Sequence, residues 1–304
     1  MLREPEPPAT SYLKSMHPIL FHSGSLPVRA YGTLIVLGFM VGLWRAMGLC
    51  TRRMQAEPEG SPRRISPDDM FDIGFYGLIV GIIGARLLFV ALDWGSFAAH
   101  PIDALKFWQG GLSLHGGMLG AILFLIYMCR RKRLSLLAAG DIGAVSWAIA
   151  YAIGRIGCLL NGCCYGGVCD LPWGVRFPDE LHPGALTPPS HPIQLYATLF
   201  NLVFFAVLLR WEKRKRADGE LYYGYIFMYG FYRYVVEIFR AGVTSTYVIP
   251  RLHLTDTHLI SLFMMLVGVM GVVWVRRNRP IYADAAMPIS SAPLISPTPG
   301  AASQ

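Results

Sequence analysis

The chain has 304 residues, of which 54% are hydrophobic and only 15% are charged, and its mean hydropathy is +0.42. About a quarter of the residues of a soluble domain are charged, so this composition excludes an ordinary soluble protein and predicts a helical protein that crosses a membrane several times. The formal net charge of +8 does not indicate a nucleic-acid partner, because the basic residues cluster in short segments between apolar stretches, where they orient membrane proteins.

Seven apolar stretches of about 18–23 residues follow one another along the chain. Each is long enough to cross a hydrocarbon core of roughly 30 Å. The first stretch is too long for a signal-peptide core and lacks a small-residue cleavage site, so we expect it to stay in the membrane. The predicted fold class is therefore all-α, a polytopic membrane protein with about seven transmembrane helices. The stretches are Ala30–Cys50, Asp72–Leu92, Leu112–Cys129, Ala138–Leu160, Pro192–Arg210, Leu221–Phe239 and Thr255–Val275.

The Lys and Arg residues between these stretches are divided unevenly between the two sides of the membrane. Sixteen lie in segments on the same side as Arg131, and five lie in segments on the other side. Because positively charged loops stay in the cytoplasm, we expect the amino terminus outside and the carboxyl terminus in the cytoplasm. The predicted parts are an extracytoplasmic segment 1–28, a membrane domain 29–277 with a small extracytoplasmic cap at about 161–191, and a disordered cytoplasmic tail 278–304.

Six arginines lie inside or at the edge of the apolar stretches, where a charge is costly and usually faces a protein interior or a wet cavity. With a rise of about 1.5 Å per residue, Arg86, Arg155 and Arg233 are expected in the outer half of the bilayer. Arg29 and Arg45 are expected to be interface arginines whose side chains reach the headgroup region. The six are Arg29, Arg45, Arg86, Arg155, Arg233 and Arg240.

Arg155 has no acidic residue within one helical turn, so its partner must come from another helix or from a ligand. Phosphate oxygens match the fork of guanidinium donors, and a phosphate at this depth would belong to a lipid headgroup. Tyr229, Arg233, Glu237 and Arg240 share one helix face by their i, i+4, i+8, i+11 spacing. An ion pair between Arg233 and Glu237 is the structural alternative for these two residues.

His115 lies in the segment GGLSLHGGMLGA, near the outer edge of the third stretch. The glycines around it, Gly116 and Gly117 among them, allow a substrate or another helix to approach the backbone. A neutral imidazole beside arginines can act as a general base, so we expect a catalytic or substrate-contacting role. A histidine that only makes packing hydrogen bonds is the alternative.

Four of the six cysteines form the run Cys-x4-Cys-Cys-x4-Cys from Cys158 to Cys169, at the outer end of the fourth stretch. This spacing is not that of a standard zinc or iron–sulfur site, so no metal site is expected. One or two structural disulfides in the cap are compatible with an oxidising compartment. A redox-active set of cysteines is the alternative, although no Cys-x-x-Cys is present.

Several motifs occur together in the order and spacing of a known family. From about Pro27 to Arg277 the chain resembles prolipoprotein diacylglyceryl transferases, in the segments RAYGTLIVLGF, GARLLFV, GGLSLHGGMLG, GRIGCLLNGCCYG, HPIQLY and YGFYRYVVEIFR. The resemblance implies transfer of the diacylglyceryl group of phosphatidylglycerol to the lipobox cysteine thiol of a prelipoprotein signal peptide, with release of glycerol phosphate and without a cofactor. It also implies a multi-pass protein of the bacterial cytoplasmic (inner) membrane.

The resemblance and the spacing arguments together give a set of candidate site residues. The catalytic candidates are His115, Arg155 and Arg233. Arg155 is also a candidate for binding substrate, together with Tyr31, Arg86, Gly116, Gly117, Asn161, Gly166, Tyr229, Glu237 and Arg240.

The chain departs from the family pattern at four positions. Cys158 and Cys163 stand where better-known members have Asn and Glu, Ala197 stands for Glu, and His258 stands for Gln. A cysteine-rich subgroup and a paralogue with an altered substrate are both compatible with these departures. Two rival functions remain open: an anionic-lipid-binding or transport protein that releases no glycerol phosphate, and a membrane thiol oxidoreductase that uses the cysteine run and a quinone.

Overall fold

The computed structural model describes residues 19–23, 26–98, 100–106, 110–179, 185–240, 247–249, 251 and 254–279. Long helices make up most of it: α1 (Ala30–Ala56), α2 (Pro67–Leu92), α4 (Leu114–Arg131), α5 (Leu136–Asn161), α6 (Ile193–Glu212), α7 (Glu220–Ile238) and α8 (Asp256–Asn278). Two short helices, α3 (Trp94–Phe97) and η1 (Pro101–Leu105), follow α2. Two antiparallel hairpins pair β1 (Ile19–Ser23) with β2 (Leu26–Arg29) and β3 (Tyr247–Ile249) with β4 (Leu254–Thr255).

Each predicted apolar stretch coincides with one long helix, so the mostly helical prediction is confirmed, while the two hairpins were not predicted. Five of these helices, α1, α2, α5, α6 and α8, are long and apolar enough to cross a membrane. α7 is not among them, because its charged Arg233 and Glu237 and its many tyrosines lower its hydropathy. The number of spans and the orientation of the termini therefore stay predictions. Most of segment 1–28 and nearly all of tail 278–304 lie outside the described residues.

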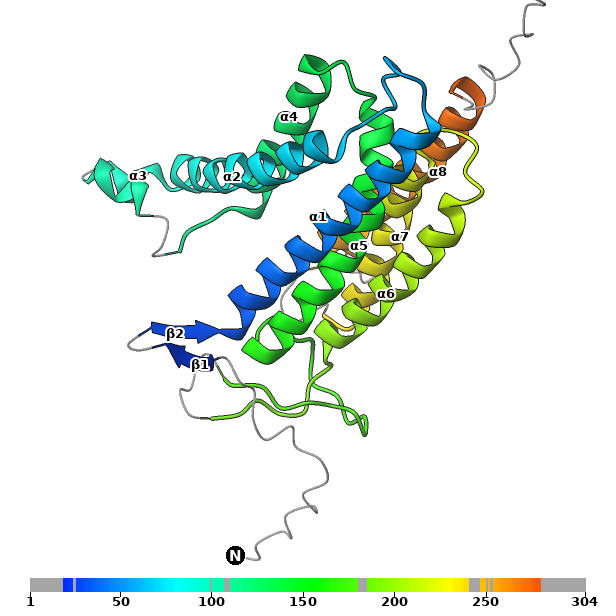
Figure 1. The fold of residues 1–304 in the computed structure, drawn as a ribbon. Coiled ribbons are helices and arrows are strands. Elements are labelled where there is room, and N and C mark those ends of the chain that lie inside the picture. Colours follow the sequence, from blue (N-terminus) through cyan, green and yellow to red (C-terminus); the bar gives the residue numbers. More distant parts are fainter. Residues whose placement is uncertain are drawn as a thin grey trace, which may run out of the picture.

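α5 is the central helix of a bundle that also contains α1, α6, α7 and α8 (Figure 1). Of its most apolar 18-residue window, 56% is buried inside the protein, against 22% for α2 and for α8. Small residues let α1 lie close along α5. A side chain at Gly38 would place its Cβ only 2.7 Å from the Ala150 carbonyl oxygen of α5. The close approach holds the amino-terminal end of α1 against the carboxyl-terminal end of α5, where the candidate site lies.

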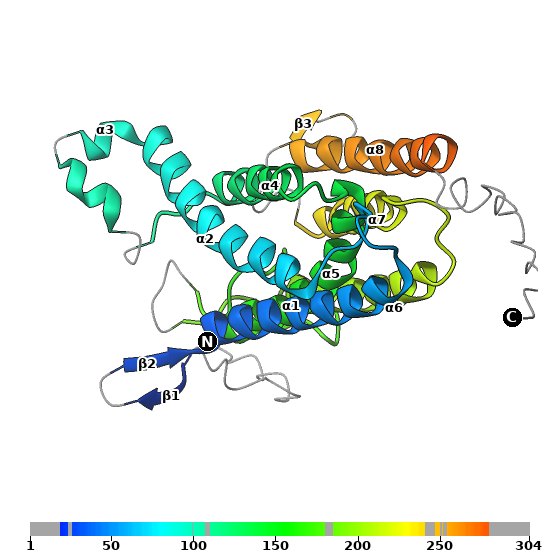
Figure 2. The ribbon, with the colours of Figure 1, turned by 45° about the horizontal axis from the view of Figure 1, so that its top comes forward.

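α2 and α4 pack along each other and lean away from the bundle, which Figures 1 and 2 show from two directions. Their contact is made through glycine backbones. A Cβ at Gly84 of α2 would lie 2.6 Å from the Gly116 carbonyl oxygen, and a Cβ at Gly116 would collide with Gly84. The α2–α4 pair is therefore a unit in itself, joined to the bundle mainly where α1 meets α2.

The outward faces of the long helices carry large apolar side chains. Trp44 on α1 is 76% exposed, and Leu87 on α2 and Phe263 on α8 are each 65% exposed. Exposing such a large apolar surface to water is unfavourable, whereas exposing it to the hydrocarbon layer of a membrane is not. A helix can face that layer because its backbone hydrogen bonds are made within the helix. The exposed apolar belt and the five apolar helices make this a multi-pass membrane protein.

Ion pairs join the helices at the end of the bundle where α5 begins. The Asp141 carboxylate, fully buried, accepts hydrogen bonds from the backbone N–H groups of Gly219, Leu221 and Tyr222 and pairs with Lys215 Nζ at 3.0 Å. Glu220 is held in the same way, by Arg276 at 3.0 Å and by Trp211 Nε1 at 2.9 Å.

Arg45 belongs to this same end of the bundle. It was expected to reach the headgroup region as an interface arginine, but its Nη2 atom lies 2.9 Å from Glu212 Oε2. It is therefore one half of an interhelical ion pair between α1 and α6.

Candidate active site

Arg155 lies on α5 and has no acidic partner. Its Nε and Nη2 atoms both donate to the Tyr151 hydroxyl, at 2.9 and 2.5 Å, and the guanidinium carbon stands 5.0 Å from the centre of the Tyr151 ring. Across the chain as described, no carboxylate forms an ion pair with it. The charge of Arg155 is therefore left for an anion, and its planar fork of donors matches phosphate oxygens.

A cluster of tyrosines connects Arg155 on α5 to Arg233 on α7. The Tyr151 ring meets the Tyr229 ring edge-on at 5.9 Å and the Tyr232 ring at 6.3 Å. Tyr229 interacts electrostatically with both Arg233 and Arg155. The tyrosine cluster thus brings the two arginines, one from each helix, to the same region.

Arg233 and Glu237 form the ion pair that their spacing allowed, with Nη2 and Oε2 3.3 Å apart. The Glu237 side chain is buried, and its Oε1 atom accepts a hydrogen bond from the Thr255 hydroxyl at 3.3 Å. Thr255 in turn caps α8 together with His258, the residue that replaces the family glutamine. Glu237 therefore connects α7 to the start of α8, and the structure places it in a structural role beside the site.

The loop after α5 closes over the end of the helix. Gly162, with φ of 75°, ends α5 in the left-handed conformation that glycine adopts without strain. Gly166 donates its N–H to the His191 carbonyl at 2.9 Å, and Gly167 donates to the Phe239 carbonyl at 2.8 Å. The loop is thus fixed to the start of α6 and the end of α7. The candidate Gly166 is needed for this close packing, because a Cβ there would lie 2.8 Å from the Phe239 oxygen.

Three thiols lie beside Arg155. The Sγ atoms of Cys158, Cys163 and Cys164 are all within 4.8 Å of one another, and none is in a disulfide. Hydrogen bonds from the Cys158 and Cys163 thiols and the nearby Arg155 and Arg240 guanidiniums hold the pKa of Cys164 below its ordinary value. The structural disulfides considered from the sequence are thus absent among the six cysteines, all of which lie in the described part.

Tyr31 and Asn161 also reach this group. Tyr31, in the first turn of α1, interacts electrostatically with Arg155 and with the three thiols. Asn161, the last residue of α5, bonds through its side chain to Cys163. Tyr31, Asn161, Tyr229, Arg155, Arg233 and Arg240 therefore form one site at the carboxyl-terminal end of α5.

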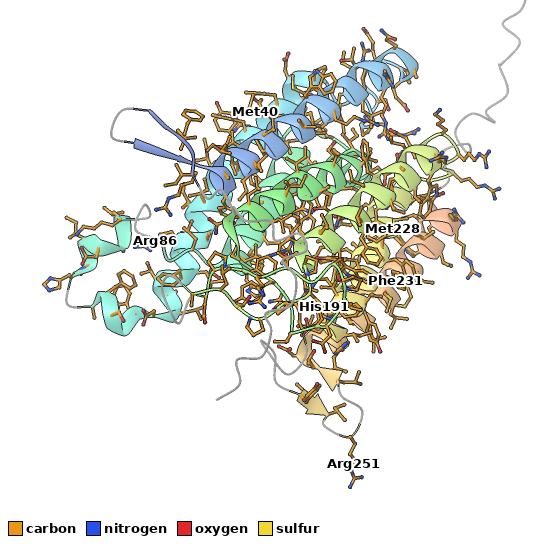
Figure 3. The ribbon with its side chains drawn as sticks, turned by 90° about the horizontal axis from the view of Figure 1, so that it is seen from below. Met40, Arg86, His191, Met228, Phe231 and Arg251 are labelled. Atoms are coloured by element: carbon orange, nitrogen blue, oxygen red, sulfur yellow. The ribbon has the colours of Figure 1, made fainter. Side chains whose placement is uncertain are left out.

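Arg86 lies elsewhere, on the α2 side of the molecule, whereas His191 lies over the end of the bundle (Figure 3). Four of the five N–H donors of Arg86 are used by backbone carbonyls. Nε donates to Ala104 at 2.8 Å, Nη2 to Asp103 at 2.7 Å, and Nη1 to Gly110 and Gly111 at 2.8 and 3.0 Å. Phe89 and Phe97 lie against its guanidinium. Arg86 therefore organises the connection between α2 and α4, and none of these hydrogen bonds joins it to Arg155 or Arg233.

His115 stands in the first turn of α4 and is exposed. None of the hydrogen bonds and ion pairs of the described residues joins it to Arg155 or Arg233. The neighbouring Gly116 and Gly117 face α2 at its Gly84 and Ala85. These two glycines thus allow the close approach of α2, which is one of the two alternatives, and a contact with substrate stays a prediction.

Three residues beside the site were not singled out from the sequence. Tyr151 precedes Arg155 by four residues, so the i, i+4 rule could have found it. Gln194, fully buried, donates to the Cys163 carbonyl at 2.5 Å. Burial lowers the pKa of His191, whose Nδ1 lies 3.3 Å from the Tyr196 hydroxyl. The Gln194 contact joins residues 31 positions apart, and the pKa of His191 depends on its burial in the folded protein. Neither feature can be recognised from a local sequence pattern.

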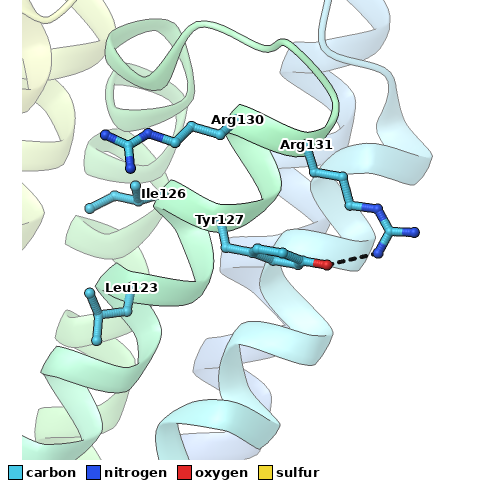
Figure 4. A pocket seen from close by; sticks show the side chains of 5 residues that line it. All are labelled: Leu123, Ile126, Tyr127, Arg130 and Arg131. Carbon is cyan, nitrogen blue, oxygen red and sulfur yellow. Dashed lines mark hydrogen bonds between the residues drawn. The ribbon is translucent and has the colours of Figure 1, made fainter.

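One surface hollow, of about 500 Å³, lies away from this site. It lies on the last turns of α4, lined by Leu123, Ile126, Tyr127, Arg130 and Arg131, with Arg131 donating to the Tyr127 hydroxyl at 2.8 Å (Figure 4). Its lining contains none of the candidate site residues. Charge and not concavity therefore identifies the candidate site.

Comparison with known proteins points the same way. Residues 18–274 match the sequence model of the family described as prolipoprotein diacylglyceryl transferase. A phosphatidylglycerol–prolipoprotein diacylglyceryl transferase of Geobacter sulfurreducens is 36% identical over 227 residues, covering 73% of this chain and 82% of that protein. Proteins of the same name from Nitrosomonas europaea and Paracidovorax citrulli are 34% and 32% identical; the matches cover 89% and 86% of this chain and 95% and 96% of those proteins.

Proposed function

The chain belongs to the prolipoprotein diacylglyceryl transferase family, and from that premise we propose that it transfers the diacylglyceryl group of phosphatidylglycerol to the lipobox cysteine of prelipoproteins. The product is a thioether, and glycerol phosphate is released. The protein works in the bacterial cytoplasmic membrane, where both the lipid and the signal peptide of the prelipoprotein are present.

The observation that carries this proposal is Arg155. It is a guanidinium at membrane depth whose side-chain hydrogen bonds, among the described residues, go only to the neutral Tyr151 hydroxyl, and no carboxylate of those residues pairs with it. An unpaired charge in such surroundings costs several kcal/mol unless a ligand compensates it. The phosphate of phosphatidylglycerol supplies that compensation while its acyl chains stay in the hydrocarbon layer.

The reaction breaks one carbon–oxygen bond and forms one carbon–sulfur bond. The substrate thiol loses its proton, its sulfur attacks the glyceryl carbon next to the phosphate, and the glycerol phosphate leaves with the bonding electrons. Negative charge grows on the leaving oxygen, and in this proposal Arg155 and Arg233 stabilise it. Tyr31, Asn161, Tyr229 and Arg240 surround the headgroup.

His115 is our proposed acceptor for the thiol proton. A free thiol has a pKa near 8.5 and is mostly protonated at neutral pH, so a general base increases the thiolate fraction. His115 lies on the α2–α4 pair, away from Arg155, and catalytic contacts often form only in the substrate complex. The phosphate site and the proton acceptor therefore belong to different units of the fold, and they are tested separately.

The transfer is tested by incubating the purified protein with phosphatidylglycerol and a lipobox peptide and then measuring the peptide mass. We expect the mass to rise by one diacylglyceryl group, glycerol phosphate to appear in equal amount, and a Cys→Ser peptide to stay unmodified. Binding of the lipid without either product would overturn the transferase and favour a lipid-binding paralogue. The variants His115→Ala and Arg155→Lys should both lose most transfer, the second because a point charge does not replace a bidentate fork.

The seven-span topology is proposed with the amino terminus outside. It is supported by the uneven division of Lys and Arg. Lys215 and Arg276, which belong to the larger group, pair with Asp141 and Glu220 at the end of the bundle where α5 begins, opposite to Arg155. A reporter fused after Arg277 should read as cytoplasmic and one inserted near Trp173 as extracytoplasmic. The reverse result would place the Arg155 site in the inner half of the membrane.

A further inference from the structure

The thiols of Cys158, Cys163 and Cys164 come together although they are dispersed over seven residues. Cys158 stands near the end of α5, and the left-handed Gly162 turns the chain so that the next two residues fold back over the helix end. Cys163 and Cys164 have their Sγ atoms 3.7 Å apart, and all three sulfurs lie within 4.8 Å of one another. The sequence spacing alone resembled no standard metal site, so this grouping is a product of the turn.

These separations suit a soft metal ion. A Zn–S bond is about 2.3 Å long, and tetrahedral angles then place two sulfurs about 3.8 Å apart. Cys163 and Cys164 are already at that separation. The widest of the three pairs needs to shorten by no more than about 1 Å to reach the same geometry. Thiolate ligands favour Zn²⁺ and Cu⁺ over hard cations such as Mg²⁺.

The backbone of the loop is strained in a way that supports the grouping. Cys164 has φ of 66°, and in the described chain only Arg133 is another non-glycine residue with a positive φ. This conformation costs a residue with a Cβ about 1–3 kcal/mol, and such residues cluster at ligand sites. The fully buried Gln194 holds the loop through the Cys163 carbonyl, and its own Oε1 atom accepts no hydrogen bond from the described residues.

The charges around the thiols also fit a bound cation. Three thiolates and one divalent ion leave a single net negative charge. The Arg155 and Arg240 guanidiniums interact electrostatically with the thiols and offset that charge.

We propose that Cys158, Cys163 and Cys164 form a three-sulfur binding site for one thiophilic divalent ion of the Zn²⁺ class. Three metal–sulfur bonds form, three thiol protons pass to the solvent, and no electron is transferred. Three protein ligands leave the fourth tetrahedral position open to water or to an external ligand. The site goes beyond the transferase reaction, whose sulfur atom comes from the prelipoprotein.

The test uses the full chain in detergent, fully reduced by a phosphine and kept under argon. It is titrated with Co²⁺, which reports thiolate ligands through sulfur-to-cobalt charge-transfer absorption. We expect one Co²⁺ per chain, displaced by Zn²⁺ and unaffected by Mg²⁺. Each of Cys158→Ser, Cys163→Ser and Cys164→Ser should weaken binding by more than about 100-fold, because even the loss of outer-shell partners costs 10- to 100-fold. Cys169→Ser is the matched control, since this buried cysteine of the same loop lies outside the three-sulfur group.

A second measurement covers variants that fail to fold. In the parent protein, Zn²⁺ should protect Cys158, Cys163 and Cys164 from maleimide alkylation, whereas Mg²⁺ should not. The proposal is overturned if the reduced parent protein shows no charge-transfer band, or if the band persists in the triple Cys→Ser variant. The peptide mass assay measures diacylglyceryl transfer independently of metal binding. Failure of the metal-site proposal and failure of the transferase proposal can therefore be told apart.

Discussion

The two ends of α5 differ in how the buried charges around them are paired. At its beginning, Asp141 is matched by Lys215 and by three backbone N–H groups, and Glu220 and Glu212 also have cationic partners. At its other end, Arg233 pairs with the buried Glu237 at 3.3 Å, whereas Arg155 forms no ion pair with a carboxylate of the described residues. The first arrangement is complete within the protein and holds helices together. The second leaves the charge of Arg155 without a carboxylate partner among the described residues, and in the function we propose a lipid phosphate compensates it.

Removing a carboxylate at the balanced end should cost mainly stability. We expect Asp141→Ala to destabilise the protein by about 3–5 kcal/mol, because Lys215 and three backbone donors lose their buried acceptor. Chemical unfolding in detergent measures the loss. Transfer per folded molecule should stay near that of the parent protein, and a large drop in that quantity would mean that the two ends are functionally coupled.

Removing an arginine at the other end should cost mainly activity. We expect Arg155→Ala to lower the rate of diacylglyceryl transfer about 100- to 1,000-fold, the usual effect of losing one donor to a developing negative charge. Its midpoint of unfolding should remain close to that of the parent protein, since no ion pair is broken. Near-normal turnover in a folded Arg155→Ala protein would contradict the phosphate-binding role.

The cysteines beside Arg155 should be dispensable for the transfer itself. We expect a protein with Cys158, Cys163, Cys164 and Cys169 all replaced by Ser to retain measurable transfer, because the nucleophilic sulfur arrives with the prelipoprotein. The peptide mass assay checks this, with His115→Ala as the inactive comparison. Complete loss of transfer in the folded quadruple variant, with His115→Ala unaffected, would favour the thiol oxidoreductase reading.

The smallest effect is expected for the partly exposed ion pair between α1 and α6. Arg45→Met should change the free energy of unfolding by only about 1 kcal/mol, because water already screens much of the attraction. The methionine keeps most of the apolar stem of the side chain. Thermal unfolding of the Arg45→Met and Asp141→Ala variants, measured side by side, gives the two losses of stability. If the loss in Arg45→Met is as large as that in Asp141→Ala, Arg45 contributes as much to stability as the buried Asp141 does.

Patterns local in the sequence predicted much of the helical architecture. Apolar runs of membrane length coincide with the long helices, because the hydrophobicity of a helix is carried by consecutive residues. The i, i+4 spacing of Arg233 and Glu237 likewise anticipated their ion pair. Arg155 could be singled out because no acid lies within a turn of it. In each case, the residues that decide the outcome lie within a few positions of one another.

Only the tertiary structure decided which buried charges are left over. In the sequence Arg86 and Arg155 look alike, yet backbone carbonyls from beyond α3 accept four hydrogen bonds from Arg86, and a single tyrosine hydroxyl accepts those of Arg155. The cysteine group depends on the turn at Gly162, and His115 lies on the α2–α4 pair, apart from the arginines. The physical reason is that hydrogen bonds and ion pairs act over a few ångströms, and chain segments far apart in sequence supply the partners.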